Sequence, residues 1–319
     1  MDNVCHTLVG AALAEAGLGR RTSLGFATLL IGANLPDLDV LSYFDGPLAA
    51  LEWRRGWSHG VVALAVLPVL LTAAMVGLDR LSRRLRRAVM PSEVRVGQVL
   101  LLAFIAIATH PMLDTLNTYG VRWTIPWRPD WTYGDTLFIV DPWVWIALAA
   151  GVWISRKRRH ARERNVVPES PARRALAFCA VYALLMAVSG FSARRIATRE
   201  LGGVADPRSV MAGPVAFNPF VREIVAAEGD EFRTGRFRWF ADPHVDPASV
   251  RTYPATRPAH PAVAAAIATT PGRRFLGWAR FPTFMIDSAG AEYRVHIVDV
   301  RYASRPGTSF GSVTVPVGR

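Results

Sequence analysis

The stretch GQVLLLAFIAIATHPMLDTLNTYG, residues 97–120, places a histidine and an aspartate in an otherwise apolar segment. His110 and Asp114 are four residues apart, so a helix brings both side chains to one face, one turn from each other. This spacing lets two side chains bind one metal ion. Ionisable groups inside a membrane are costly and mark a functional site by default. The stretch therefore predicts a membrane-spanning helix that carries part of a polar site.

Long apolar segments organise the first part of the chain. A helix needs ~20 residues to cross the ~30 Å hydrocarbon core of a bilayer. We expect full spans at residues 60–78, 96–116, 137–155 and 175–191. Two shorter apolar stretches, residues 4–18 and 23–35, precede these spans. They predict either a hairpin of short helices or helices that lie partly in the membrane interface.

Basic residues indicate the orientation of these spans. The loops at 79–95 and 156–174 hold fourteen Arg and Lys residues, whereas the two short loops on the opposite side hold four. Such an excess is typical of cytoplasmic loops. We therefore expect a multi-pass membrane protein with these two basic loops in the cytoplasm and everything after residue 192 on the outer side. The net charge of +12 is explained by these loops, so we expect contact with membrane lipids and no nucleic-acid partner.

The character of the chain changes after Ser192, where short segments alternate between polar and apolar residues. RFRWF (236–240), RFLGWARF (274–281) and EYRVHIVDVRYA (292–303) are examples, and alternation is typical of half-buried strands. We predict a mainly α polytopic membrane protein with a small C-terminal mainly β extramembrane domain. The helical bundle, with four full spans and an N-terminal short helical hairpin, occupies residues 1–191, and the β domain occupies residues 192–319.

Several metal-binding residue types converge on the outer side of this arrangement. His59 precedes the first full span, and the segment NLPDLD follows the second short stretch, where an extended turn would let Asp37 and Asp39 both bind. The predicted ligands are His6, Asp37, Asp39, His59, His110 and Asp114. Mixed imidazole and carboxylate ligands suit a divalent transition metal, most of all Zn, with Mn or Fe as alternatives. The number of groups allows one or two ions.

This ligand set predicts hydrolytic chemistry. A bound Zn-type ion lowers the pKa of its water toward ~7, and a second ion can hold both oxygens of a phosphoester displacement. An aspartate outside the coordination shell can serve as general base, and the candidates are Asp37, Asp39 and Asp141. Since the site opens where lipid head groups lie, we expect an amphipathic or lipid-linked ester or phosphoester as substrate. The sequence identifies no protein partner.

In these motifs the chain resembles the YdjM-type family of membrane-bound metal-dependent hydrolases. The resemblance rests on His6, LPDLD (35–39), GWSHG (56–60) and HPMLD (110–114), in that order, and covers residues 1–150 most firmly. It implies an integral inner-membrane protein with a site similar to that of zinc-dependent phospholipase C. With the orientation given above, the C-terminal domain would then be periplasmic. The chain departs from the common Thr-His-Ser pattern, because Ser58 precedes the histidine and Gly60 follows it.

Two functions from other classes compete with the hydrolase. One is a non-catalytic membrane scaffold, in which the polar cluster binds a structural metal or only joins helices. The other is a metal or proton transporter. A transporter needs polar groups along the inner half of its spans, and residues 61–78, 97–108 and 143–154 offer hardly any. This composition favours the hydrolase over the transporter.

Overall fold

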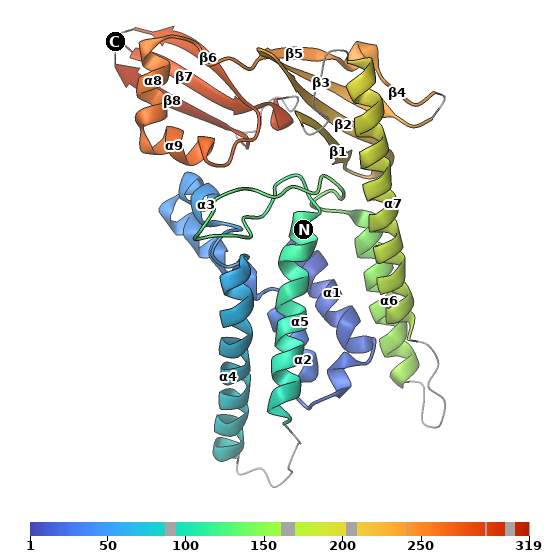
Figure 1. Ribbon diagram of the computed structural model, residues 1–319. Helices are drawn as coiled ribbons and strands as arrows, with labels where there is room; N and C mark the ends of the chain where they lie inside the picture. Colours follow the sequence, from blue (N-terminus) through green and yellow to red (C-terminus); the bar gives the residue numbers. More distant parts are fainter. Residues whose placement is uncertain are drawn as a thin grey trace. The chain divides into compact units, whose positions relative to one another are not determined.

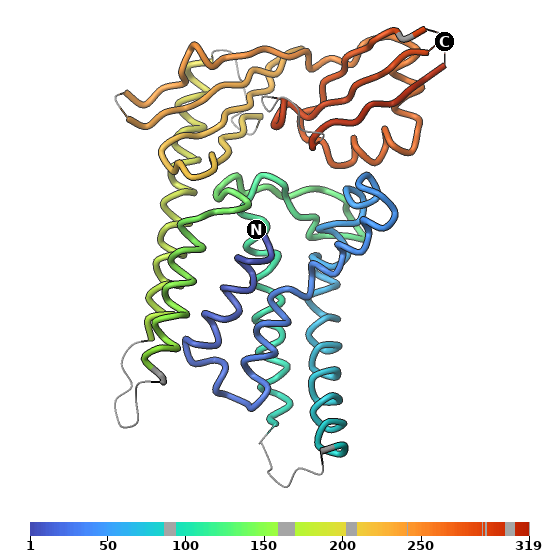
Figure 2. The backbone as a smooth tube through the Cα atoms, turned by 180° about the vertical axis from the view of Figure 1, so that it is seen from behind, coloured from blue at the N-terminus to red at the C-terminus, as the bar shows by residue number. Residues whose placement is uncertain are grey.

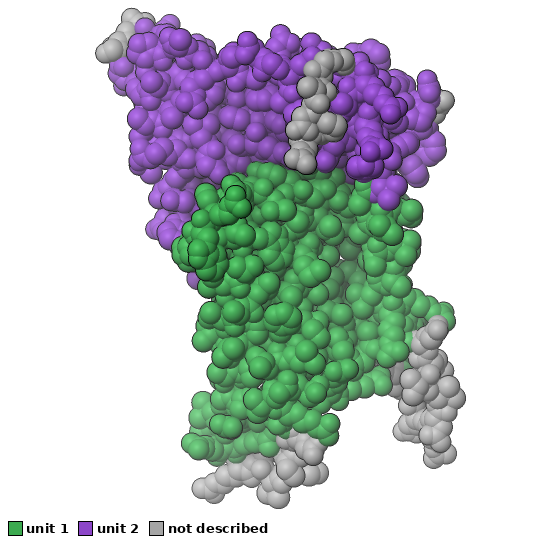
Figure 3. Space-filling view, viewed as in Figure 1, with its two compact units in different colours: residues 1–39, 55–187 green, residues 40–54, 188–319 purple. Residues whose placement is uncertain are grey.

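The computed structural model describes residues 1–86, 94–160, 170–201, 209–240, 242–290, 292–303 and 310–318. The chain forms two compact units, shown in separate colours in Figure 3. Unit 1 comprises residues 1–39 and 55–187, and unit 2 comprises residues 40–54 and 188–319. The short internal segment 40–54 thus belongs with the C-terminal part of the chain.

Unit 1 is helical (Figure 1). Its elements are α1 (Asn3–Glu15), η1 (Leu18–Arg20), α2 (Gly25–Gly32), the start of the 3-10 helix η2 (Leu35–Asp45), α4 (Val61–Arg86), α5 (Val96–Thr115), α6 (Pro142–His160) and the first part of α7 (Pro171–Glu200). Helix α5 packs against α4 and α2, and α1 packs against α2 and α6, an arrangement that can be followed from both sides in Figures 1 and 2.

Small residues let the helices around α5 approach closely. Leu102, Ala103, Ala106 and Ile107 of α5 are fully buried. A Cβ atom added to Gly32 of α2 would lie 2.9 Å from the Ala106 side chain. Between α1 and α2, a Cβ atom on Gly10 would lie 2.7 Å from the Leu29 carbonyl oxygen. Small residues at such contacts are characteristic of helices that pack within membranes.

The predicted membrane spans are confirmed in part. Within the described residues, three helices are long and apolar enough to cross a membrane: residues 61–85 of α4, and α5 and α7 over their full lengths. Helix α6 covers most of the third predicted span, residues 137–155, but is not among these three helices, so its crossing stays a prediction. The two short N-terminal stretches are helical in α1 and α2, and their placement as a membrane hairpin also stays a prediction.

Unit 2 contains two antiparallel sheets. The first sheet has the order β1 (Val210–Val215), β2 (Asn218–Glu228), β3 (Glu231–Arg238), β4 (His244–Val245), with β5 (Arg251–Pro254) also paired to β3. The second sheet has the order β6 (Pro282–Ala289), β7 (Glu292–Asp299), β8 (Ser312–Gly318). In β7 the side chains of Val295, Ile297 and Asp299 are buried at alternate positions, as the sequence predicts. The prediction of a mainly β C-terminal domain is confirmed.

The segment RFLGWARF (274–281), which the sequence analysis gave as an example of strand alternation, does not form a strand. Its first three residues end the helix α9 (Thr270–Leu276) and the rest leads toward β6, where Pro282 is the first residue. Thr269 caps α9 by accepting a hydrogen bond from the Gly272 amide. Phe275, Trp278 and Phe281 are buried and spaced by three, a period that suits a helical turn and not the two-residue period of a strand. The prediction of an alternating strand at this segment was therefore wrong.

Two further helices complete unit 2 around its second sheet. Helix α8 (Pro261–Ala268) packs on β7 and β8, while α9 packs on β8. The internal segment contributes α3 (Pro47–Trp53), which packs on α9. An ion pair of 2.7 Å joins Glu52 of α3 to Arg274 of α9. This contact shows how residues 40–54 attach to the C-terminal part of the chain.

Candidate metal centre

Five of the six predicted ligands meet in unit 1, although they come from four separate segments. His6 lies on α1, Asp37 on η2, His59 in the turn before α4, and His110 and Asp114 on α5. Their ligand atoms form two groups in which all atoms lie within 4.8 Å of one another, namely His6, Asp37 and His110, and His59, His110 and Asp114. All five residues are buried. The sequence therefore identified the cluster and its members on α5.

The distances within the cluster are those of ligands around an ion. His59 Nε2 lies 3.4 Å from Asp114 Oδ2, and His110 Nε2 lies 3.8 Å from the same oxygen. Asp37 faces both rings, with oxygens 4.0 Å from His59 Nε2 and 3.6 Å from His110 Nε2. Two ligands of a tetrahedral Zn ion, each bonded at ~2.0–2.1 Å, are separated by roughly 3.3 Å. The cluster is thus close to the spacing that a bound ion requires.

Two buried histidine nitrogen atoms without hydrogen-bond partners indicate whether these residues fit a metal ion. Among the described residues, the buried Nε2 atoms of His59 and His110 have no hydrogen-bond partner. Leaving a buried polar atom unpaired costs about 1–3 kcal/mol, so each such atom needs an explanation. An ion between the imidazole and carboxylate groups would satisfy both atoms at once. The side chains present therefore fit a metal ion.

The second nitrogen of each imidazole is fixed by a neighbour. His110 Nδ1 lies 2.6 Å from the Ala33 carbonyl oxygen. Since a carbonyl oxygen only accepts, Nδ1 carries the proton and Nε2 presents a lone pair. His110 thus offers one ligand atom, and the two groups of residues share it. The cluster is one connected ligand set rather than two separate sites.

Asp39 lies behind His59 rather than within either group. Its Oδ2 is 3.3 Å from His59 Nδ1, and it accepts hydrogen bonds from Ser58 Oγ at 2.8 Å and from the Arg55 amide at 2.9 Å. A carboxylate in this position fixes the tautomer and orientation of a metal-binding histidine. Burial lowers the pKa of His59 to about 4 against the opposing hydrogen bond with Asp39, so the ring is neutral near pH 7.

The conformation of LPDLD explains why its two aspartates separate. The sequence suggested an extended turn that would let both carboxylates bind, but η2 is a 3-10 helix from Leu35 to Asp45. A 3-10 helix has about 3.0 residues per turn, so residues two apart point in different directions. Asp37 consequently faces His110, while Asp39 reaches the far side of His59.

Arg55 is the main residue of the centre that the sequence interpretation missed. It was counted as a loop charge, yet it is buried, with Nε 2.9 Å from Asp114 Oδ2 and Nη1 2.9 Å from Asn117 Oδ1. Its backbone has a φ of 54°, in the left-handed region. The amino group of Met1 also contacts Asp114. The only sequence signal for its role is its position, because Arg55 directly precedes the motif GWSHG that contains His59.

Asp141 lies outside both groups of candidate ligands, at the start of helix α6. Its Oδ1 accepts hydrogen bonds from the amides of Trp143 and Val144 at the start of α6, and its Oδ2 accepts one from Tyr182. These contacts are those of a helix N-cap. Asp141 belongs to neither group of metal-ligand candidates.

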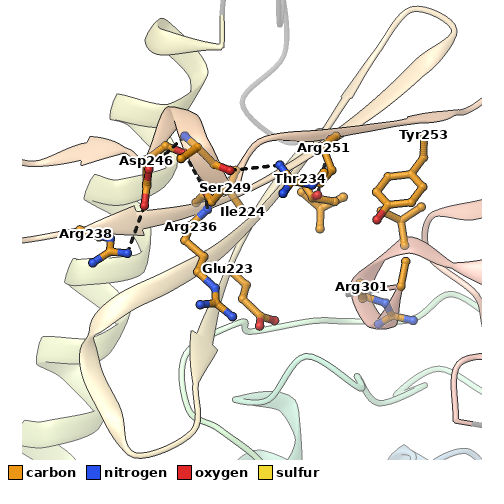
Figure 4. A pocket seen from close by; sticks show the side chains of 15 residues that line it. Glu223, Ile224, Thr234, Arg236, Arg238, Asp246, Ser249, Arg251, Tyr253 and Arg301 are labelled. Atoms are coloured by element: carbon orange, nitrogen blue, oxygen red, sulfur yellow. Dashed lines mark hydrogen bonds and ion pairs between the residues drawn. The ribbon is translucent and has the colours of Figure 1, made fainter. Parts of the chain in front are cut away.

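A larger cavity, of about 480 Å³, lies in unit 2 and contains none of the predicted ligands (Figure 4). Its lining includes four arginines, but acidic neighbours compensate two of them. Arg238 pairs with Asp246 at 3.1 Å, and Arg301 pairs with the buried Asp299 at 2.7 Å. Since none of the predicted ligands lines this cavity, it is not part of the metal centre.

Comparison with known proteins bears on the identity of the chain. A family model described as YdjM inner membrane protein matches residues 1–196, which include the whole cluster and unit 1. No curated protein and no solved structure matches the chain significantly. The family description and the three apolar helices agree on a membrane protein. Because the match covers more than half of its length, this chain belongs to the YdjM inner membrane protein family.

Proposed function

We propose that this chain is a membrane-bound metal-dependent hydrolase that cleaves an ester or phosphoester bond in a lipid or lipid-linked substrate. The observation that carries the proposal is the pair of unpaired Nε2 atoms of His59 and His110, which face the Asp114 carboxylate at 3.4 and 3.8 Å. Imidazole and carboxylate groups in this arrangement are typical ligands of hydrolytic Zn sites, and Mn or Fe are the alternatives.

Each residue of the centre has a distinct role in this proposal. His6, His59, His110 and Asp114 would hold the ion, which when bound would supply a water of lowered pKa and polarise the bond to be cleaved. Asp37 is the general base that accepts the proton of that water. At 6% exposed, it is the most accessible of the five members of the cluster. Asp39 is a positioning residue that acts through His59.

Location at the membrane surface supports an amphipathic substrate. Asp114 is the penultimate residue of α5, a candidate span, so the centre lies near one end of the hydrocarbon core. The excess of basic residues in the opposite loops favours an outward centre at the periplasmic face of the inner membrane. By the same argument, the C-terminal β-rich part is periplasmic.

A structural metal site is the competing function, and the near-complete burial of His59, His110 and Asp114 favours it. Structural Zn sites are closed by protein ligands, whereas catalytic sites keep one position open for water. The same substitution separates the two functions. Replacing the general base reduces turnover, whereas replacing a side chain beside a structural metal alters only stability.

The experiment uses purified protein in detergent, loaded with Zn, and chromogenic phosphodiester and carboxyl-ester substrates. We expect turnover that a chelator abolishes, and Asp37→Asn should lower it by roughly 10²–10⁴-fold, the usual share of a general base. The exposed Asp130 in a short outer loop provides the matched control, and Asp130→Asn should leave turnover unchanged. A protein that binds metal yet cleaves neither substrate class would refute the hydrolase and favour the structural site.

A further inference from the structure

An apolar pocket of about 240 Å³ lies within unit 1, among helices α1, α5, α6 and α7. Leu137, Val144 and Leu148 form part of its buried lining. Within the described lining, the hydroxyl of Thr109 is already committed, because it donates to the Ala106 carbonyl. A pocket of this composition offers a polar molecule no partner and suits a hydrocarbon chain.

Two candidate membrane spans each contribute an exposed residue to the lining of the pocket. Met112 of α5 and Ala180 of α7 line it and are exposed. Both residues lie on helices long and apolar enough to cross the membrane. A chain from the surrounding lipid can therefore enter without passing through water.

The pocket adjoins the metal centre through α5. His110 and Asp114 point into the cluster, whereas their neighbours Thr109 and Leu113 line the pocket. Successive helical residues are rotated by about 100°, so adjacent faces of one helix serve the two sites. Met1 links the sites a second time, because it lines the pocket while its amino group contacts Asp114.

We infer that this pocket binds the hydrocarbon chain of the substrate, while the bond to be cleaved lies at the metal centre. The inference rests on the proposed function and narrows its substrate class to molecules with an alkyl or acyl chain beside the hydrolysed group. A head group alone reaches the cluster but leaves the pocket unfilled. Burying each methylene of a chain increases affinity roughly fourfold.

The test is a labelling experiment that requires no turnover. Dodecyl phosphonate with a photoreactive diazirine at the chain end is added to the protein in lipid nanodiscs, and labelled peptides are identified by mass spectrometry. Ala183→Phe fills the pocket, and Val181→Phe adds the same side chain to an exposed position of α7. We expect label on the pocket residues of α6 and α7, lowered several-fold by Ala183→Phe and unchanged by Val181→Phe.

The metal centre supplies the second arm of the test. His110→Ala removes the anchor for the phosphonate group and should also lower the pocket label several-fold, at matched folding in both proteins. Equal labelling of the pocket and of the exposed face of α7 would mean bulk lipid contact and would overturn the inference. Pocket label that survives His110→Ala would overturn it as well, because the chain would then bind independently of the centre. Failure of the hydrolase itself shows separately, as absence of turnover with the chromogenic substrates.

Discussion

At the scale of single residues, the geometry of the cluster begins with the spacing of its members along one helix. His110 and Asp114 share a face of α5 because they are four residues apart, and the structure brings them to one cluster with His59. Asp37 and Asp39 could not be separated in this way, because their relation depends on whether LPDLD is extended or helical. Arg55 was beyond prediction, since burial of a loop arginine depends on the fold around it.

Asp39 gives the first prediction at this scale. Replacing it with asparagine keeps the shape but removes the negative charge that faces His59 Nδ1. We expect Asp39→Asn to lower metal affinity by about 10–100-fold, as is usual for the partner of a metal-binding histidine. Competition with a metal-binding dye measures the change. Asp45→Asn, at the exposed end of η2, is the control, and equal affinities in the two variants would argue against the positioning role.

Arg55 gives the second prediction, which concerns stability. Arg55→Ala leaves the buried Asp114 without the guanidinium 2.9 Å away. Breaking a buried ion pair costs about 3–5 kcal/mol, so we expect a large fall in the melting temperature of the metal-free protein. Added metal should restore part of it, because the ion replaces the lost positive charge. Arg54→Ala removes a half-buried neighbour as control, and an equal loss in both would show that the Asp114 contact is unimportant.

At the scale of elements, close packing of the helices brings the cluster residues together. The sequence alone gives only their order along the chain. Helix α1 carries His6, and its approach to α2 depends on Gly10, which lies one turn after His6. Hydropathy identifies such helices but not their neighbours, because every apolar face looks alike in the sequence. The segment RFLGWARF was wrongly predicted as alternating, since the spacing of three between Phe275, Trp278 and Phe281 fits a helical turn.

Gly10 gives a prediction at the element scale. A leucine there would place its Cβ 2.7 Å from the Leu29 carbonyl oxygen, so α1 must move away from α2 and carry His6 with it. We expect Gly10→Leu to lose bound metal while remaining helical by circular dichroism. Gly77→Leu on α4 is the control, because a Cβ at Gly77 meets nothing within 4 Å. Full metal content in Gly10→Leu would show that His6 does not depend on this contact.

At the scale of the whole molecule, the sequence predicted the two kinds of structure but not the full membership of each unit. The change from apolar helices to short alternating strands is a local signal and was read correctly. The attachment of residues 40–54 to the second unit is not local, because it depends on contacts such as that of Glu52 with Arg274. Whether α6 crosses the membrane cannot be decided from its length and apolar composition alone.

Membrane topology is a prediction at this scale. The basic loops at 79–95 and 156–174 place the metal centre and the C-terminus on the opposite side of the membrane. An alkaline phosphatase reporter at Arg319 should therefore be active, and the same reporter inserted in loop 79–95 should be inactive. The reverse pattern would place the centre on the cytoplasmic side and exclude a periplasmic substrate.

The most direct test of the account is the metal content of the purified protein. The wild type, His59→Ala and His110→Ala are loaded with Zn, freed of excess metal and analysed by plasma mass spectrometry at matched folding. His296→Ala, which removes a histidine from β7 in unit 2, is the control. The account predicts tightly bound metal in the wild type and in His296→Ala, and a large loss in the two cluster variants. Equal metal content in all four proteins would contradict a metal centre at His59, His110 and Asp114.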